Sequence, residues 1–142
     1  MDTLKYLIDK YKIDISQKSP FYIRCERYVD IPKLFTELGF MVGAEIGVAH
    51  GEYSECLLKG IPGLKLYGID LWQPYDSSGV CPQSEKTKNY EKLARERTKE
   101  YDCEMMKGWS SESVKRFRDE SLDFVFIDGN HAYEYVVEDI AQ

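Results

Sequence analysis

A short apolar run that breaks into glycines constrains this chain more than any other feature. Residues 42–54 read Val-Gly-Ala-Glu-Ile-Gly-Val-Ala-His-Gly-Glu-Tyr-Ser, a pattern that predicts a strand, a tight turn and a helix. Gly47 and Gly51 suit the turn because a residue without Cβ bends sharply and lets a ligand come close to the backbone. A small nucleotide-like molecule could therefore bind at this turn.

A second apolar run ends in a carboxylate about 20 residues further along the chain, the spacing found in nucleotide-binding α/β units. It reads Leu-Lys-Leu-Tyr-Gly-Ile-Asp at residues 64–70, and an acid in the place of Asp70 typically bonds ribose hydroxyls. The spacing of the glycines narrows the choice of ligand. A dinucleotide site needs G-x-G-x-x-G, whereas this chain has Glu45-x-Gly47-x-x-x-Gly51, so NAD is disfavoured.

Strand patterns alternate with helix patterns along the rest of the chain. Further strands are predicted at residues 102–107 and 122–128, and the second is almost continuously apolar, as in a parallel strand buried on both faces. Helices are predicted at residues 4–11, 31–38, 53–59, 84–99 and 133–140, with a short one starting near Ser110. This alternation indicates an α/β fold with a doubly wound, mainly parallel sheet. We expect one domain over residues 1–142, with an N-terminal helical segment at 1–41 and a core at 42–142.

Capping residues indicate where several helices begin and end. Asp2, Asp30 and Ser110 are each placed to cap a helix N-terminus, and Gly39 follows the last apolar residue of the second helix. In the helix predicted at 84–99, Leu93 is expected to face inward. The preceding loop leaves the carboxyl end of the second strand, so it is a candidate for contact with a substrate.

The composition limits the kinds of partner. A net charge of −6 disfavours nucleic acid, because phosphate backbones are bound by clustered Lys and Arg. No apolar run approaches the ~20 residues of a membrane helix, and the first residues lack a signal-peptide pattern, so we expect a cytoplasmic protein without membrane contact. The four cysteines show no C-x-x-C spacing, which favours free thiols in a reducing compartment. A neutral or cationic small molecule fits this charge best.

Two motifs resemble those of a known family. The acid-x-Gly-x-x-x-Gly pattern from Glu45 to Gly51 resembles the first motif of class I S-adenosylmethionine-dependent methyltransferases. Residues 127–133, Ile-Asp-Gly-Asn-His-Ala-Tyr, are similar to the Ile-Asp-Gly-Asp/Asn-His-x-Tyr segment of a subgroup with small-molecule O-methyltransferases and macrocin-type sugar methyltransferases. The resemblance implies a Rossmann-like sheet of order 3-2-1-4 and methyl transfer from S-adenosylmethionine to a small-molecule hydroxyl. The alternative is a non-catalytic cofactor-binding or assembly module with the same fold.

The resemblance also implies which residues bind the cofactor. Glu45 would serve the methionine ammonium, directly or through water, and Asp70 the ribose unless it is a structural cap. Trp72 would stack on adenine or merely pack, and Ser54 would donate to the cofactor or cap its helix. The implied set is Glu45, Gly47, Val48, Gly51, Ser54, Asp70, Trp72, Trp109 and Ser110.

The catalytic assignments fall after the fourth predicted strand. Asp128 and His131 are the candidates, with His131 as a general base or as a structural residue bonded to a neighbouring loop. In some relatives an acid in the place of Asp128 helps to hold Mg²⁺, which would polarise a substrate hydroxyl. The other ligands of that ion come from a later part of those proteins, so one carboxylate is weak evidence for a metal.

The resemblance predicts further strands beyond residue 142. Without them, the fourth strand would form an exposed edge of the sheet although its composition favours burial on both faces. We therefore expect either that the chain is a fragment, incomplete at its C-terminus, or that a partner covers this edge, with a homodimer as the simplest partner.

Overall fold

Four parallel strands form the centre of the computed structural model, which describes residues 2–18, 20, 22–73 and 88–141. The strands are β1 (Val42–Ile46), β2 (Lys65–Asp70), β3 (Cys103–Lys107) and β4 (Phe124–Ile127). Their order in the sheet is β3-β2-β1-β4, and each neighbouring pair is parallel. The predicted α/β class, the Rossmann-like sheet and its strand order are confirmed.

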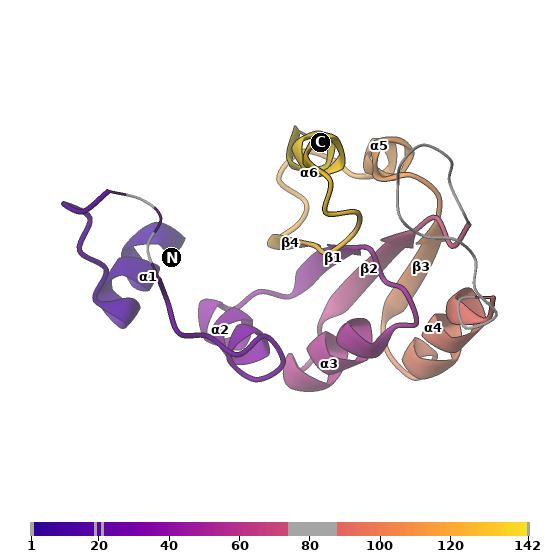
Figure 1. The fold of residues 1–142 in the computed structure, drawn as a ribbon. Coiled ribbons are helices and arrows are strands. Elements are labelled where there is room, and N and C mark those ends of the chain that lie inside the picture. Colours follow the sequence, from indigo (N-terminus) through magenta and orange to yellow (C-terminus); the bar gives the residue numbers. More distant parts are fainter. Residues whose placement is uncertain (1, 19, 21, 74–87, 142) are drawn as a thin grey trace.

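Helices cover both faces of this sheet (Figure 1). One face carries α2 (Asp30–Leu38), α3 (Glu52–Gly60) and α4 (Tyr90–Thr98), and the other carries α5 (Ser110–Ser113), the 3₁₀ turn η1 (Val114–Arg116) and α6 (Tyr133–Ala141). The first helix, α1 (Thr3–Tyr11), lies beyond α2 at one end of the molecule. It is joined to α2 by the Tyr6 hydroxyl, which donates to Glu37 Oε2 at 2.7 Å.

The helix boundaries confirm some of the predicted caps and correct others. Asp2 caps α1 by accepting from the Lys5 backbone N–H at 3.0 Å, and Gly39 ends α2 with a φ of 75°. Asp30 does not cap α2, because the helix begins at Asp30 itself and its carboxylate accepts from the Glu26 N–H at 2.7 Å. Leu93 of α4 was expected inside but is 42% exposed. Residues 84–87 of the predicted helix 84–99 and most of the loop before it lie outside the described residues.

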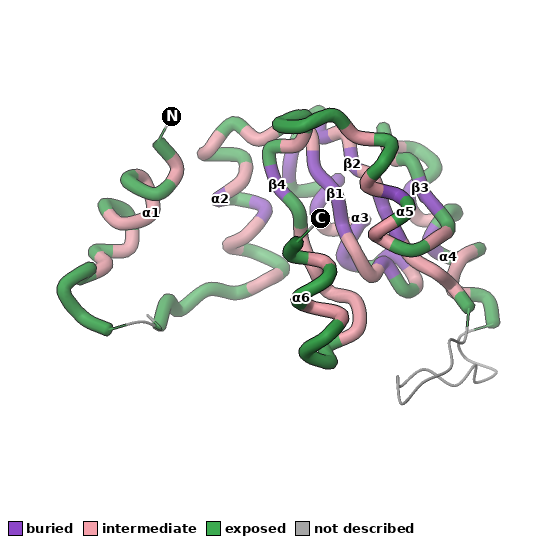
Figure 2. The backbone as a smooth tube through the Cα atoms, turned by 90° about the horizontal axis from the view of Figure 1, so that it is seen from above, coloured by how far each residue is buried: buried purple, intermediate pink, exposed green. Residues whose placement is uncertain are grey.

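The larger core cluster lies between the sheet and α3 (Figure 2). Leu57 and Ile61 of this helix region pack on Leu66 of β2, and each is at most 1% exposed. The Phe124 ring completes the cluster and lies 4.3 Å from the Phe35 ring, centroid to centroid. Burial of these side chains, worth about 1.5–3 kcal/mol each, fixes α2 and α3 beneath the strand that carries the glycine turn.

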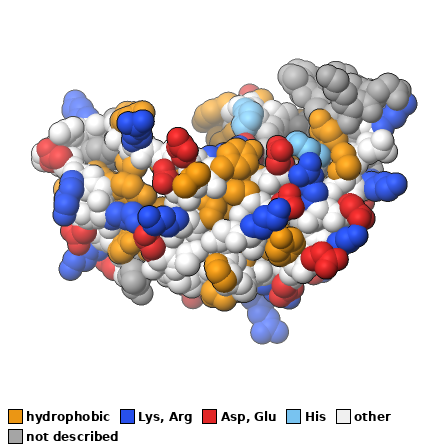
Figure 3. Space-filling model, turned by 90° about the horizontal axis from the view of Figure 1, so that it is seen from below, with side chains coloured by type: hydrophobic (Ala, Val, Ile, Leu, Met, Phe, Trp, Pro, Cys, Tyr) orange, Lys and Arg blue, Asp and Glu red, His pale blue; other side chains and the backbone are white. Residues whose placement is uncertain are grey.

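Charges of both signs are interspersed on the helical face that Figure 3 shows. Glu55 of α3 illustrates this, because it pairs with Lys59 at 2.7 Å and with Arg97 of α4 at 3.3 Å. Within the described part of the chain, no helix has the length and apolar character that a membrane crossing requires.

The strand β4 lies at the edge of the sheet and is buried on one face only. Phe124 and Phe126 pack toward α3, whereas Val125 on the opposite face is 49% exposed. In the described residues β4 pairs with β1 alone, and α6 beside it has no buried residue. β4 is therefore an exposed edge of the sheet, as expected for these four strands alone.

Candidate cofactor-binding site

The carboxyl ends of three neighbouring strands bring three acids to one edge of the sheet. Glu45 lies on β1, Asp70 ends β2 and Asp128 follows β4. Backbone bonds hold the turn after β1 between its neighbours, since the Gly47 N–H donates to the Ile69 carbonyl at 2.8 Å. On the other side, the Asp128 N–H donates to the carbonyl of residue 46 at 2.7 Å. Ligands of open α/β sheets bind at this end of the strands.

Both glycines of the turn are required by the packing of the chain on itself. Gly47 has a φ of 91°, and a Cβ there would lie 2.3 Å from the Asp128 carbonyl oxygen. Gly51 has a φ of 79°, and its Cβ would lie 2.7 Å from Cα of Ala94 in α4. From the sequence, these glycines are explained by the need for a ligand to approach the backbone. The structure adds a second reason, which is that neighbouring segments leave no room for a Cβ at either position.

Glu45 is an acid held almost out of contact with water, at 1% exposure. Burial raises the pKa of its carboxyl to about 7, against the opposing effects of a hydrogen bond from Ser54 and the charge of Arg27. The Ser54 hydroxyl donates to Glu45 Oε2 and is itself fully buried. Ser54 thus neither caps α3 nor points to solvent, but fixes the acid of the glycine motif.

Asp70 connects the glycine turn to the segment that follows β2. Its Oδ2 accepts from the Ala49 N–H at 2.8 Å and its Oδ1 accepts from the Trp72 N–H at 2.7 Å. A carboxylate has about four acceptor positions, so two remain for a ligand. Asp70 is therefore a structural cap that keeps the capacity to bind hydroxyls.

Trp72 and Val48 form the wall beside Asp70. The Trp72 indole N–H donates to the Ala49 carbonyl at 2.7 Å, and its ring packs on a cluster containing Val48 and Met105. Ala49 and Trp72 both have a positive φ, at 50° and 43°, which is uncommon for residues with a Cβ. Val48 is 3% exposed and so serves this wall by packing.

The end of β3 lies next to β2, because the Gly108 N–H donates to the Asp70 carbonyl at 3.0 Å. The two following residues of the predicted set contact α6. The Trp109 ring is parallel to the Tyr135 ring at 6.4 Å, and the Ser110 hydroxyl donates to Asp139 Oδ1 at 2.5 Å. Ser110 is the first residue of α5 and Trp109 its N-cap, so the expected cap by Ser110 is wrong.

Asp128 is paired with a cation that the sequence did not single out. Its Oδ2 accepts from Arg27 Nη2 at 2.5 Å, while His131 Nε2 lies 3.9 Å from Oδ1 on a side chain that is 80% exposed. Across the residues that the structure describes, no group of three or more His, Cys, Asp and Glu could hold a metal ion. The expectation of Mg²⁺ at Asp128 thus finds no support, and a guanidinium occupies the place beside this carboxylate.

Arg27 comes from the irregular segment before α2, which carries no periodic pattern. Its guanidinium carbon lies 4.1 Å from the centroid of the Tyr53 ring and 5.1 Å from that of Phe126. Its Nε is buried and has no hydrogen-bond partner among the described residues. Only the tertiary fold reveals this residue, since Arg27 and Asp128 are 101 positions apart in the sequence.

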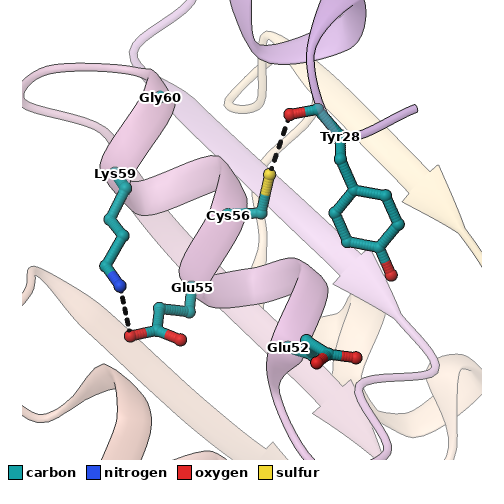
Figure 4. Close-up of a pocket in the computed structure, with 6 residues that line it drawn as sticks. All are labelled: Tyr28, Glu52, Glu55, Cys56, Lys59 and Gly60. Atoms are coloured by element: carbon teal, nitrogen blue, oxygen red, sulfur yellow. Dashed lines mark hydrogen bonds and ion pairs between the residues drawn. The ribbon is translucent and has the colours of Figure 1, made fainter. Parts of the chain in front are cut away.

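An open hollow on the outer side of α3 is separate from these strand ends (Figure 4). It is lined by Tyr28, Glu52, Glu55, Cys56, Lys59 and Gly60. Among its lining residues, the Cys56 thiol donates to the Tyr28 carbonyl at 3.2 Å and Lys59 pairs with Glu55 at 2.7 Å. The hollow thus lies where the N-terminal segment packs on α3, and Glu45, Asp70 and Asp128 do not line it.

Comparison with known proteins agrees with this geometry. Residues 44–142 match the family model described as "Methyltransferase domain". No protein of the curated set matches the chain significantly.

Solved structures share the fold at low sequence identity. An O-methyltransferase from Bacillus cereus in complex with S-adenosylhomocysteine (SAH) is 19% identical to this chain, with a TM-score of 0.54. The match covers 91% of this chain and 55% of that protein. An SAH-bound methyltransferase from Podospora anserina is 15% identical, with a TM-score of 0.57 over 99% of this chain and 56% of its own. The chain therefore spans about half the length of these proteins.

Proposed function

Because the chain belongs to the methyltransferase domain family, we propose that its strand ends bind S-adenosylmethionine and that the protein methylates a hydroxyl of a small molecule. The observation that carries this proposal is the convergence of Glu45, Asp70 and the glycine turn at one edge of the sheet. The SAH-bound neighbours of the same fold support the choice of cofactor.

The residues at this edge fit the chemical groups of the cofactor. The buried acid Glu45 suits an ammonium, and the two remaining acceptor positions of Asp70 suit ribose hydroxyls. Trp72 and Trp109 offer aromatic faces for the adenine, and Ser110 follows Trp109. Gly47, Val48 and Gly51 supply the turn, and Ser54 orients Glu45.

When bound, the cofactor supplies a methyl group on a positively charged sulfur. The chain's own task is to align the acceptor and to exclude water from the strand ends. We assign Asp128 and His131 to the acceptor side, with the exposed imidazole as the base that takes the hydroxyl proton and Asp128 near it. We assign no step to a metal ion.

The rival function is a cofactor-binding or assembly module without turnover. A transfer assay with S-adenosylmethionine labelled in its methyl group, against a panel of phenols, sugars and other small hydroxyl compounds, separates the two. Labelled product that needs His131 supports the enzyme, whereas tight cofactor binding without transfer to any acceptor favours the module.

Asp70→Ala should weaken S-adenosylhomocysteine binding by roughly 1.5–3 kcal/mol, the range for hydrogen bonds to a charged group. It should also lower the free energy of unfolding, because the variant leaves the Ala49 and Trp72 N–H groups without their acceptor. Calorimetric titration and chemical denaturation measure the two effects.

The matched control for this variant is Asp123→Ala. Asp123 Oδ2 accepts from the Met41 and Val42 N–H groups at 2.7 and 2.9 Å, at the opposite end of the sheet. Its loss should cost similar stability and leave cofactor affinity unchanged. Equal binding by the Asp70 variant and the parent chain would make Asp70 a structural cap only.

We also propose that the exposed edge of β4 pairs with a second copy of the chain. Val125 is 49% exposed there, and Tyr133 and Ile140 of the adjacent α6 are 78% and 70% exposed. Light scattering should give a mass that rises with concentration, and Val125→Lys should reduce it toward the monomer. The control Leu4→Lys, at an exposed apolar residue of α1, should leave the measured mass unchanged. A parent chain that stays monomeric at all concentrations would contradict this proposal.

A further inference from the structure

We propose that Arg27 binds the carboxylate of the cofactor's amino-acid part, so that the segment before α2 is a component of the cofactor site. The inference rests on the proposed function and adds a residue to it. The set predicted from sequence offers partners for the ammonium, the ribose and the adenine, but none for this carboxylate.

The charges at the strand ends call for a cation at this place. Glu45, Asp70 and Asp128 are all acids, so an incoming carboxylate would be repelled unless a positive group lies beside it. Arg27 is that group, because its guanidinium bonds Asp128 at 2.5 Å and its charge also acts on Glu45.

The order of the strands places Arg27 at the correct end of the ligand. With the ribose at Asp70 on β2, the amino-acid part extends either toward β3 or toward β1 and β4. The buried acid Glu45, which suits the ammonium, lies on β1, so the carboxylate of the same amino acid lies within reach of Arg27.

The guanidinium is oriented and has a donor to spare. Its Nη2 donates to Asp128, and 38% of the side chain stays exposed, so a ligand can still reach part of the guanidinium. A guanidinium has five N–H donors, so it can bond a second carboxylate while it keeps its bond to the first. The rings of Tyr53 and Phe126, at 4.1 and 5.1 Å from the guanidinium carbon, hold its plane in place.

Two ligands that differ only in the carboxylate test this inference by calorimetry. The parent chain should bind S-adenosylmethionine about 10- to 100-fold more tightly than decarboxylated S-adenosylmethionine, as expected for a charge-assisted hydrogen bond. Arg27→Gln should bind the two ligands almost equally, because the substitution lowers the affinity for S-adenosylmethionine and leaves the affinity for the decarboxylated ligand nearly unchanged. Arg27→Lys should keep part of the preference, since it retains the charge without the planar fork.

The control is Arg24→Gln, an exposed arginine of the same segment, which should keep the full preference. The ratio of the two affinities within one variant is independent of the fraction of folded protein. A parent preference that survives in Arg27→Gln, or a parent chain without preference, overturns the role of Arg27 alone. A parent chain that binds neither ligand overturns the proposed function as well.

Discussion

At pH 8, Glu45→Gln is expected to raise the free energy of unfolding by roughly 3 kcal/mol relative to the parent chain. The carboxyl of Glu45 has a pKa of about 7 in the folded chain, against an ordinary value of 4.5, chiefly because it is buried. The folded state therefore holds a proton between pH 4.5 and 7 that the unfolded state has lost, so the parent chain loses stability as the pH rises through this window. Glutamine imitates the protonated side chain and can still accept from Ser54.

Urea denaturation at several pH values between 4.5 and 8 measures this difference. The curves of the two proteins should meet near pH 4.5 and separate as the pH rises, reaching a constant difference above pH 7. Glu52→Gln, at an exposed acid of α3, is the control and should follow the parent curve. Parallel curves for the parent and Glu45→Gln would show that Glu45 ionises normally.

Glu45→Gln should also weaken the binding of the cofactor, because a neutral amide cannot balance the positive charge of an ammonium group. A gain in stability together with a loss of affinity is the pattern expected where a strained site is kept for function. If Glu45→Gln instead binds S-adenosylhomocysteine as well as the parent does, Glu45 has only a structural role.

Gly47→Ala should lower the free energy of unfolding by roughly 2–5 kcal/mol, from a left-handed backbone with a Cβ and from overpacking. The new Cβ would lie 2.3 Å from the Asp128 carbonyl oxygen and 2.5 Å from Cα of Gly129. These are backbone atoms, so the end of β4 must move away from the turn, and cofactor binding should be lost with it.

The control for this effect is Gly39→Ala, where φ is also positive, at 75°, but nothing lies within 4 Å of the added Cβ. In Gly39→Ala the free energy of unfolding should fall only by the cost of a left-handed backbone with a Cβ, roughly 1–2 kcal/mol. This variant should bind the cofactor normally. Equal losses for the two variants, measured by denaturation, would show that the contact between the glycine turn and β4 is not tight.

The fold was predictable because its signals are local. An apolar run followed by glycines identifies β1, and an apolar run ending in Asp70 identifies β2, whatever the rest of the chain does. The strand order came from the resemblance to a family and not from periodicity. The exposed edge at β4 followed from that strand order, because the apolar composition of a strand does not show what lies beside it.

The candidate site was predictable only in part. Glu45, Gly47, Gly51 and Asp70 could be found because they stand at strand ends within one motif or a fixed spacing. Arg27 could not, since its partners Tyr53 and Asp128 meet it only in the tertiary structure.

The roles of serines were likewise ambiguous from sequence. A serine at a helix start satisfies a capping pattern as well as a tertiary bond. In the folded chain Ser54 bonds Glu45 and Ser110 bonds Asp139, and neither cap is formed by these side chains.

A titration of the purified protein with S-adenosylhomocysteine and, separately, with NAD tests the central claim most directly. We predict one site for S-adenosylhomocysteine, with stabilisation of the fold by about 2.7 kcal/mol at 100 times the dissociation constant, and no heat of binding with NAD. Binding of NAD without binding of S-adenosylhomocysteine would contradict the account.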